Sequence, residues 1–176
     1  MENVGGNSKQ GNRRVPLDVR LINPFISGTK EVFEVMAGIP VKRKSLSLKK
    51  DYKMFGEISG IMGLTGDAVG SIIISFPKKL ADDVVSKFLG IEDGENINED
   101  DMRDGVGEIL NMITGKAKTL LASTEYYFKL SIPTVIMGQN YEISHSKDTP
   151  CIVVIFEAIN LQFILQVSLS PHKKQE

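Results

Sequence analysis

The sequence predicts an α+β fold in which an antiparallel β-sheet carries helices packed on one of its faces. Three observations lead to this prediction. Residues 98 to about 122 have the apolar periodicity of a helix, residues 40–76 have the pattern of consecutive strands, and the C-terminal third is rich in strands. The resulting order of helix, three strands, two helices and several strands is typical of a sheet whose helices segregate to one face.

The chain begins with a polar segment. Residues 1–14 contain three glycines and three asparagines and no apolar face, so a disordered tail is predicted over residues 1–15. A helix follows, with the recurrent positions Phe25, Thr29, Val32, Phe33 and Met36. It could begin at Pro24, which the first turn of a helix tolerates, or near Leu17 with a bend at Pro24. Gly38 is expected to end it.

Three strands are predicted next, over residues 41–48, 55–64 and 68–76, and a Thr65-Gly66-Asp67 turn joins the last two. The glycines at 56, 60, 63, 66 and 70 lack the spacing of a phosphate-binding loop, which favours tight hairpins. Pro77 then ends the third strand and opens a helix from 78 to about 89. Its predicted inward residues are Leu80, Val84, Val85 and Phe88.

The second of the two central helices carries the most informative pattern. Asn98 is a suitable N-cap, with Asp101 at the third helical position. Apolar residues at 102, 106, 109, 113, 117 and 120 fall in one sector of the helical wheel. A second sector, roughly 160° away, contains Asp101, Asp104, Glu108, Asn111 and Gly115.

This polar sector is either an ordinary solvated helix surface or a docking surface. An asparagine inside a helix competes for backbone hydrogen bonds, and each glycine costs about 0.8–1 kcal/mol relative to alanine. Gly105 and Gly107 precede Glu108, and Gly115 continues its stripe. Bare backbone beside a polar pair therefore favours the close approach of something large.

The C-terminal third is predicted to contain strands over 128–137, 140–145, 151–158 and 161–169, with the last reversal at 158–160. Exposed sheet edges on apolar segments such as 151–156 would be compatible with a homodimer. With 176 residues, of which 41% are hydrophobic, the chain can form one domain over 16–170, followed by a charged tail over 171–176.

Composition excludes several classes of function. The net charge of −1 gives no basic footprint for nucleic acid, and the longest apolar run, 151–156, is too short to span a membrane. One cysteine and two histidines leave no cluster for a protein-built metal site, so no metal or bound cofactor is predicted. Cys151 lies in an apolar run and is expected to be buried. A cytoplasmic protein is the simplest interpretation.

The helix motif resembles the signature of the CheC/CheX/FliY phosphatases. It consists of Glu108-x-x-Asn111, preceded by Asp104 and followed about twenty residues later by Pro133. The resemblance includes residues 18–26, the Gly63-Leu-Thr-Gly-Asp67 turn and strand 71–76, and it covers about 17–169. This chain contains a single copy of the motif, and in this respect it resembles the CheX branch of the family. The resemblance implies the CheC/CheX-like fold, a homodimer, and hydrolysis of the aspartyl phosphate on a CheY-like receiver.

The resemblance also implies roles for individual residues. Asn111 would orient the attacking water, and Glu108 would dock to the lysine beside the phosphate of the receiver, which supplies its own Mg²⁺. Asp104 would orient Glu108 or contact the partner, or would only favour the helix electrostatically. Gly105, Gly107 and Gly115 would allow close approach, and Pro133 would shape the strand that follows the helix and would not touch the substrate.

Two other functions are compatible with the same residues. The first is a receiver-binding or dimerisation module without catalysis, against which the presence of both Glu108 and Asn111 argues. The second is an enzyme for a small phosphorylated molecule, against which the lack of a phosphate-binding loop argues.

Overall fold

The computed structural model describes residues 19–49, 56–92, 95–143 and 149–171, and it confirms the predicted α+β architecture. The elements follow one another as α1 (Val19–Met36), β1 (Lys42–Leu48), β2 (Ile58–Gly66), β3 (Ala68–Phe76), α2 (Lys78–Leu89), α3 (Glu99–Leu121), β4 (Phe128–Leu130), β5 (Thr134–Met137), β6 (Cys151–Ala158) and β7 (Leu161–Pro171). The tails predicted over 1–15 and 171–176 lie outside the described residues, except for Pro171, which ends β7.

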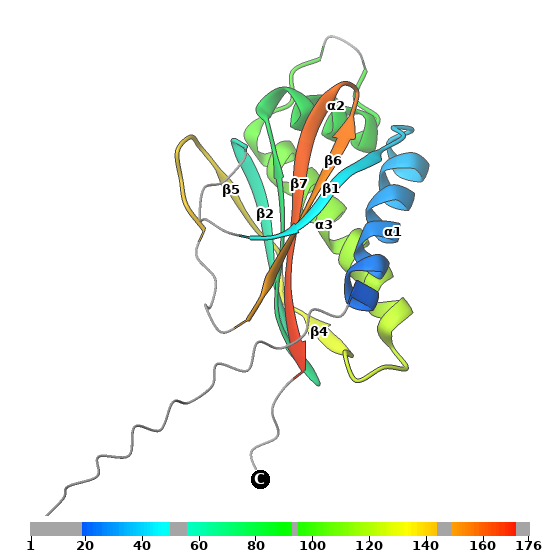
Figure 1. The fold of residues 1–176 in the computed structure, drawn as a ribbon. Helices are drawn as coiled ribbons and strands as arrows, with labels where there is room; N and C mark the ends of the chain where they lie inside the picture. Colours follow the sequence, from blue (N-terminus) through cyan, green and yellow to red (C-terminus); the bar gives the residue numbers. More distant parts are fainter. Residues whose placement is uncertain (1–18, 50–55, 93–94, 144–148, 172–176) are drawn as a thin grey trace, which may run out of the picture.

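All strands belong to one antiparallel sheet with the order β1-β6-β7-β3-β2-β4, and β5 also pairs with β2 (Figure 1). Strand β6 lies between β1 and β7, so the prediction of an exposed edge at 151–156 is wrong. Which strand becomes an edge depends on the pairing order, and apolar composition alone does not reveal it. The edge on that side of the sheet is β1.

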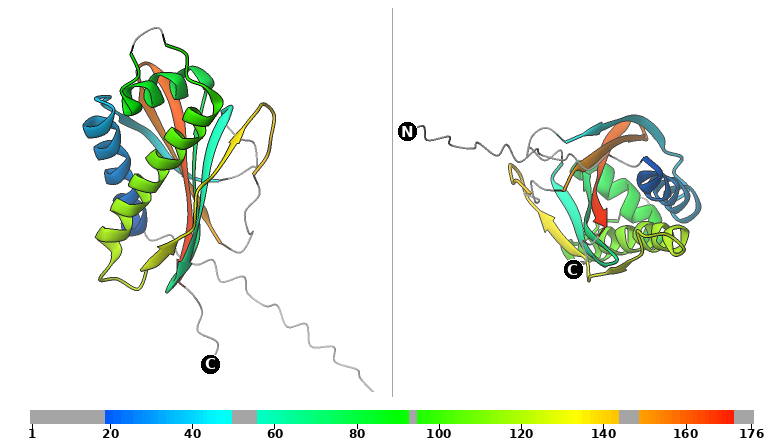
Figure 2. Two further views of the ribbon diagram at one scale, coloured as in Figure 1. Left: turned by 180° about the vertical axis from the view of Figure 1, so that it is seen from behind. Right: turned by 60° about the horizontal axis from the view of Figure 1, so that its bottom comes forward.

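The helices lie together on one side of a strongly curved sheet, as the end-on view in Figure 2 shows. Phe163 on β7 is the centre of the core between these layers. Its ring lies 4.8 Å from that of Phe33 on α1, 5.3 Å from that of Phe76 on β3 and 5.2 Å from that of Phe156 on β6. Rings at these separations pack favourably beyond the area that they bury, so they fasten α1 to the sheet.

Helix α1 follows the longer of the two predicted alternatives, because it begins before Pro24 and contains it. Phe25, Val32 and Phe33 are buried as expected, whereas Met36 in the last turn is 42% exposed, which corrects its predicted inward position. Gly38 ends the helix with a φ of 63°, a left-handed conformation that glycine adopts without steric cost.

The segment predicted as one strand over 128–137 is two strands with a bulge between them. Leu64 of β2 pairs with Leu130, and Ile61 pairs with Thr134. Residues 131–133 therefore face only residues 62 and 63 of β2, so the segment contains one extra residue. A β-bulge of this kind re-aims side chains and interrupts the ladder.

The strand predicted over 140–145 is absent from the described part of that segment. Asn140 has a φ of 58°, which turns the chain, and only an isolated bridge at Glu142 remains. Residues 144 and 145 lie outside the described residues. The reversal predicted at 158–160 is confirmed: Ile159 and Asn160 both have positive φ and join β6 to β7 as a two-residue hairpin.

Cys151 is buried at the start of β6, as predicted. Burial raises the pKa of its thiol to about 11, although the nearby Lys49 charge acts in the opposite direction.

The Cys151 thiol therefore stays protonated at pH 8, and we expect the folded protein to resist alkylation by iodoacetamide until denaturant is added. Mass spectrometry of the alkylated chain checks this, and equally rapid labelling with and without denaturant would contradict it.

Candidate functional site

Helix α3 carries the site, and its first turn is fixed by local contacts. The Asn98 side chain accepts a hydrogen bond of 2.8 Å from the Asp101 backbone amide, which confirms the predicted N-cap. Glu99, Asp100 and Asp101 place negative charge at this end, where the helix dipole favours it. Arg103 reaches back to Glu99 at 3.0 Å and Asp100 at 3.3 Å.

The apolar face of α3 is buried nearly as predicted. Met102, Val106, Ile109, Ile113 and Ala117 contact the core. Leu120 is 50% exposed instead, and Leu121 occupies the inward position in the last turn. Leu110 is buried as well, so the buried face of α3 is broader than the predicted stripe.

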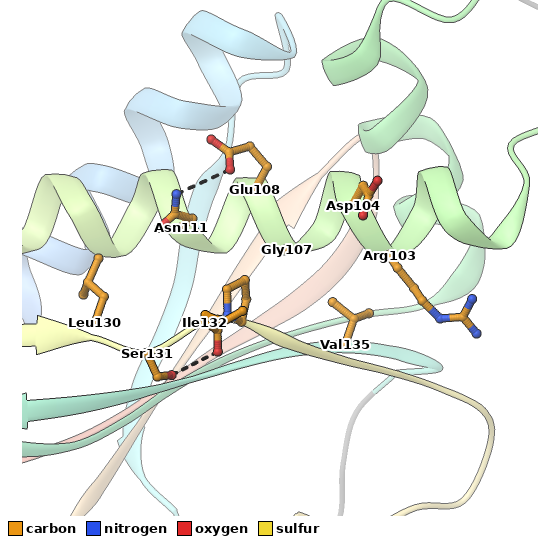
Figure 3. Close-up of a pocket in the computed structure, with 10 residues that line it drawn as sticks. Arg103, Asp104, Gly107, Glu108, Asn111, Leu130, Ser131, Ile132 and Val135 are labelled. Carbon is orange, nitrogen blue, oxygen red and sulfur yellow. Dashed lines mark hydrogen bonds between the residues drawn. The ribbon is translucent and has the colours of Figure 1, made fainter.

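Glu108 and Asn111 lie next to each other on the opposite, accessible face. The Asn111 Nδ2 donates to Glu108 Oε2 at 3.4 Å, a long and therefore weak hydrogen bond (Figure 3). Glu108 is exposed and Asn111 is partly exposed, while Asp104 lies one turn earlier, also exposed. Both polar groups of the pair can thus exchange this contact for contacts with an incoming molecule.

An open pocket of about 760 Å³ lies in front of this pair. Helix α3 forms one wall, and the chain around the bulge between β4 and β5 forms the other (Figure 3). The lining residues on the helix are Arg103, Asp104, Gly107, Glu108 and Asn111, and those on the opposite wall are Leu130, Ser131, Ile132, Pro133 and Val135. The pocket therefore brings Pro133 of the predicted signature together with Glu108 and Asn111.

The second wall is the part of the site that the sequence pattern did not reveal, apart from Pro133. Pro133 directly precedes β5 and lines the pocket, and its role in shaping the strand stays a prediction. A Cβ atom at Gly107 would lie 3.5 Å from Pro133 Cγ, so this glycine lies directly against the opposite wall. The Ile132-Pro133 pair within an otherwise strand-like run was the only available sign of an interruption.

The three glycines of α3 have different surroundings. A Cβ atom at Gly105 would come within 2.5 Å of Val85 Cγ1 on α2, so Gly105 permits helix packing, and the prediction that it admits a partner is wrong. Gly107 lies in the pocket wall. A Cβ atom at Gly115 would meet nothing within 4 Å beyond its chain neighbours and the adjacent backbone of its own helix, which leaves the backbone open on the Glu108–Asn111 side.

Two further kinds of feature are absent from the described part of the chain. Within the described ranges, no group of three or more histidine, cysteine, aspartate or glutamate side chains is arranged to hold a metal ion. None of the described helices combines the length and the apolar character that crossing a membrane requires.

Comparison with known proteins gives consistent matches. The family model for the chemotaxis phosphatase CheX matches residues 58–157, a range that contains Glu108, Asn111 and Pro133. The CheY-P phosphatase CheX of Thermotoga maritima is 28% identical over 127 residues, which are 72% of this chain and 81% of that protein.

Solved structures agree over most of the chain. The chemotaxis protein CheX from Desulfovibrio desulfuricans has a TM-score of 0.79 and 34% identity, covering 86% of this chain and 100% of that one. A chain of the CheX-CheY-BeF3-Mg²⁺ complex from Borrelia burgdorferi has a TM-score of 0.70 and 25% identity, with coverage of 86% and 99%.

Proposed function

Because the chain belongs to the CheX family of chemotaxis phosphatases, we propose that it hydrolyses the aspartyl phosphate of a CheY-like response regulator at the α3 pocket. The observation that carries the proposal is the exposed pair of Glu108 and Asn111, joined only by a 3.4 Å hydrogen bond at the pocket wall. The relative from Borrelia burgdorferi forms a complex with CheY, which supports a receiver as the partner.

Asn111 is assigned to the attacking water. Its carboxamide can donate and accept hydrogen bonds at once, so it can hold a water molecule in line with the phosphorus–oxygen bond to the aspartate. A neutral amide does so without presenting negative charge to the phosphoryl group. Because an acyl phosphate is intrinsically reactive, orientation of water is the main contribution required, and no covalent enzyme intermediate forms.

Glu108 is assigned to docking. Its exposed carboxylate lies one turn from Asn111 and can pair with the lysine beside the phosphate of the receiver. The Mg²⁺ of the reaction is held by the receiver and neutralises charge on the phosphoryl oxygens. Asp104 lies in the same pocket wall, and it either contacts the partner or only supports the helix electrostatically.

The decay of acyl phosphate on a Mg²⁺-loaded CheY, measured with and without this protein, tests the proposal. Faster decay with the protein supports it. Unchanged decay despite measurable binding would favour the alternative of a non-catalytic receiver-binding module, and absence of binding would contradict both.

The homodimer, the cytoplasmic location and the lack of nucleic-acid binding stay predictions. A second copy of the chain would have the β1 edge available for pairing.

Glu108→Ala is expected to weaken receiver binding and to slow hydrolysis together. An exposed ion pair contributes about 0–1 kcal/mol, so the dissociation constant should rise by up to about fivefold, and less at high salt. Titration calorimetry at two salt concentrations and the decay assay check this. Asp104→Asn is the matched control, because it removes a neighbouring exposed charge. Equal effects of both variants would show that Glu108 contributes only to the overall negative charge of this surface and makes no specific contact with the receiver lysine.

A further inference from the structure

Ile132 is the most exposed large hydrophobic residue of the described chain, with 88% of its surface accessible. It lies on the rim of the pocket, in the wall opposite helix α3 (Figure 3). Its neighbours on that wall, Leu130 and Val135, are partly buried. Single exposed apolar residues are common on protein surfaces, and Ile132 differs from them in how its backbone is held.

The backbone around Ile132 is fixed rather than loose. The Ser131 amide donates to the Gly63 carbonyl at 3.0 Å, and the Gly63 amide donates to Ser131 Oγ at 2.9 Å. Ser131 Oγ in turn donates to the Ile132 carbonyl at 3.0 Å, and Pro133 restricts the backbone of Ile132, the residue before it. Strands β4 and β5 anchor both ends of this segment on β2.

The bulge explains why the side chain points outward. Ser131 is already bonded to Gly63, so Ile132 and Pro133 together face Met62 of β2, and the sheet cannot accommodate both. The extra residue leaves the ladder, and Ile132 becomes exposed at the pocket. An apolar side chain on a preorganised backbone binds with little further loss of conformational entropy.

We propose that Ile132 is the apolar docking contact for the receiver domain, which buries it beside the phosphorylated aspartate while Asn111 and Glu108 engage the phosphate site. The inference rests on the proposed function, since it names a second contact with the same partner. A receiver whose aspartyl phosphate reaches Asn111 must enter the pocket, and Ile132 stands on the opposite rim of that pocket.

The contact contributes to affinity and not to chemistry. The polar pair alone offers exposed interactions that water and salt weaken. Burial of an isoleucine side chain against an apolar patch of the receiver adds a term that salt does not screen. Ile132 is thus a positioning residue, and its loss should raise KM and the dissociation constant while kcat changes little.

The experiment uses the CheY receiver on which the wild-type chain is active, both phosphorylated and in its BeF3- and Mg²⁺-bound form. Ile132→Ala should raise the dissociation constant for the BeF3 form about tenfold, equivalent to about 1.4 kcal/mol, and raise KM similarly. Ile132→Lys should weaken binding further. The matched control is Val35→Ala on α1. The Val35 side chain is aliphatic and 71% exposed, and it lies far along the chain from the pocket, so the dissociation constant and KM should not change.

The possible failures are distinguishable. If the wild-type chain accelerates hydrolysis and Ile132→Ala binds the BeF3 form as tightly as wild type, the docking proposal is overturned and the proposed function stands. If no receiver is dephosphorylated by the wild type, the proposed function itself fails and the docking proposal falls with it. Unchanged receiver affinity together with altered self-association in light scattering would assign Ile132 to a second copy of the chain.

Discussion

Asn111→Ala is expected to abolish the acceleration of receiver dephosphorylation, by a factor of at least about 100. The carboxamide is the group proposed to hold water in line for attack, and alanine provides neither a donor nor an acceptor. Receiver binding should be nearly unchanged, because Glu108 and the opposite pocket wall remain. The rate of phosphate loss from CheY and the dissociation constant of its BeF3 form measure the two effects separately.

Folding is not expected to obscure this result. Asn111 is partly exposed, its bond to Glu108 is long, and alanine has the higher helix propensity. The matched variant Asn111→Asp keeps the shape but adds a negative charge facing the phosphoryl group, so it should be inactive as well. Full activity of Asn111→Ala would show that the water is oriented by another group.

Gly105→Ala is expected to destabilise the protein by about 1–3 kcal/mol, despite a gain in helix propensity of up to about 1 kcal/mol. The added Cβ would come within 2.5 Å of Val85 Cγ1 and 3.2 Å of Val85 Cγ2. Valine is branched at Cβ and cannot swing aside easily, so α2 and α3 must separate. Urea denaturation followed by circular dichroism measures the change in the free energy of unfolding.

Gly115→Ala in the same helix is the control for propensity. Apart from its chain neighbours and the adjacent backbone of the helix itself, no atom lies within 4 Å of the added Cβ, so the substitution should stabilise the protein, by about 0.5–1 kcal/mol. Opposite signs at Gly105 and Gly115 would establish that packing against Val85 requires the first glycine. Stabilisation by both substitutions would contradict the close contact between α2 and α3.

Helix α3 was predictable because its determinants are local. The Asn98 cap, the buried period and the adjacency of Glu108 and Asn111 all depend on residues within a few turns of each other. The error at Leu120 has a different origin. Leu120 lies five full turns after Met102, on the same side of the helix, yet it is 50% exposed, because burial in the last turn depends on what the rest of the fold packs against it. For Gly105, the sequence showed correctly that something approaches, but Val85 becomes its neighbour only through the packing of α2 on α3.

The opposite wall of the pocket was not predictable in the same way. It depends on the pairing of β2 with both β4 and β5, which are more than sixty residues away along the chain. The strand propensity of residues 128–137 contains no information about which register β2 imposes. The same reason explains the wrong assignment of 151–156 as an edge, because the order of strands in a sheet is a property of the whole fold.

The bulge between β4 and β5 also has a consequence for how such a site can arise. Removing one residue from 131–133 would make the pairing of Phe128–Leu130 and Thr134–Met137 with β2 one regular ladder, with every partner unchanged. The sheet itself therefore has no need of the extra residue. Gain or loss of a single codon at this point would create or erase the raised rim of the pocket, while the core that folds the chain stayed as it is.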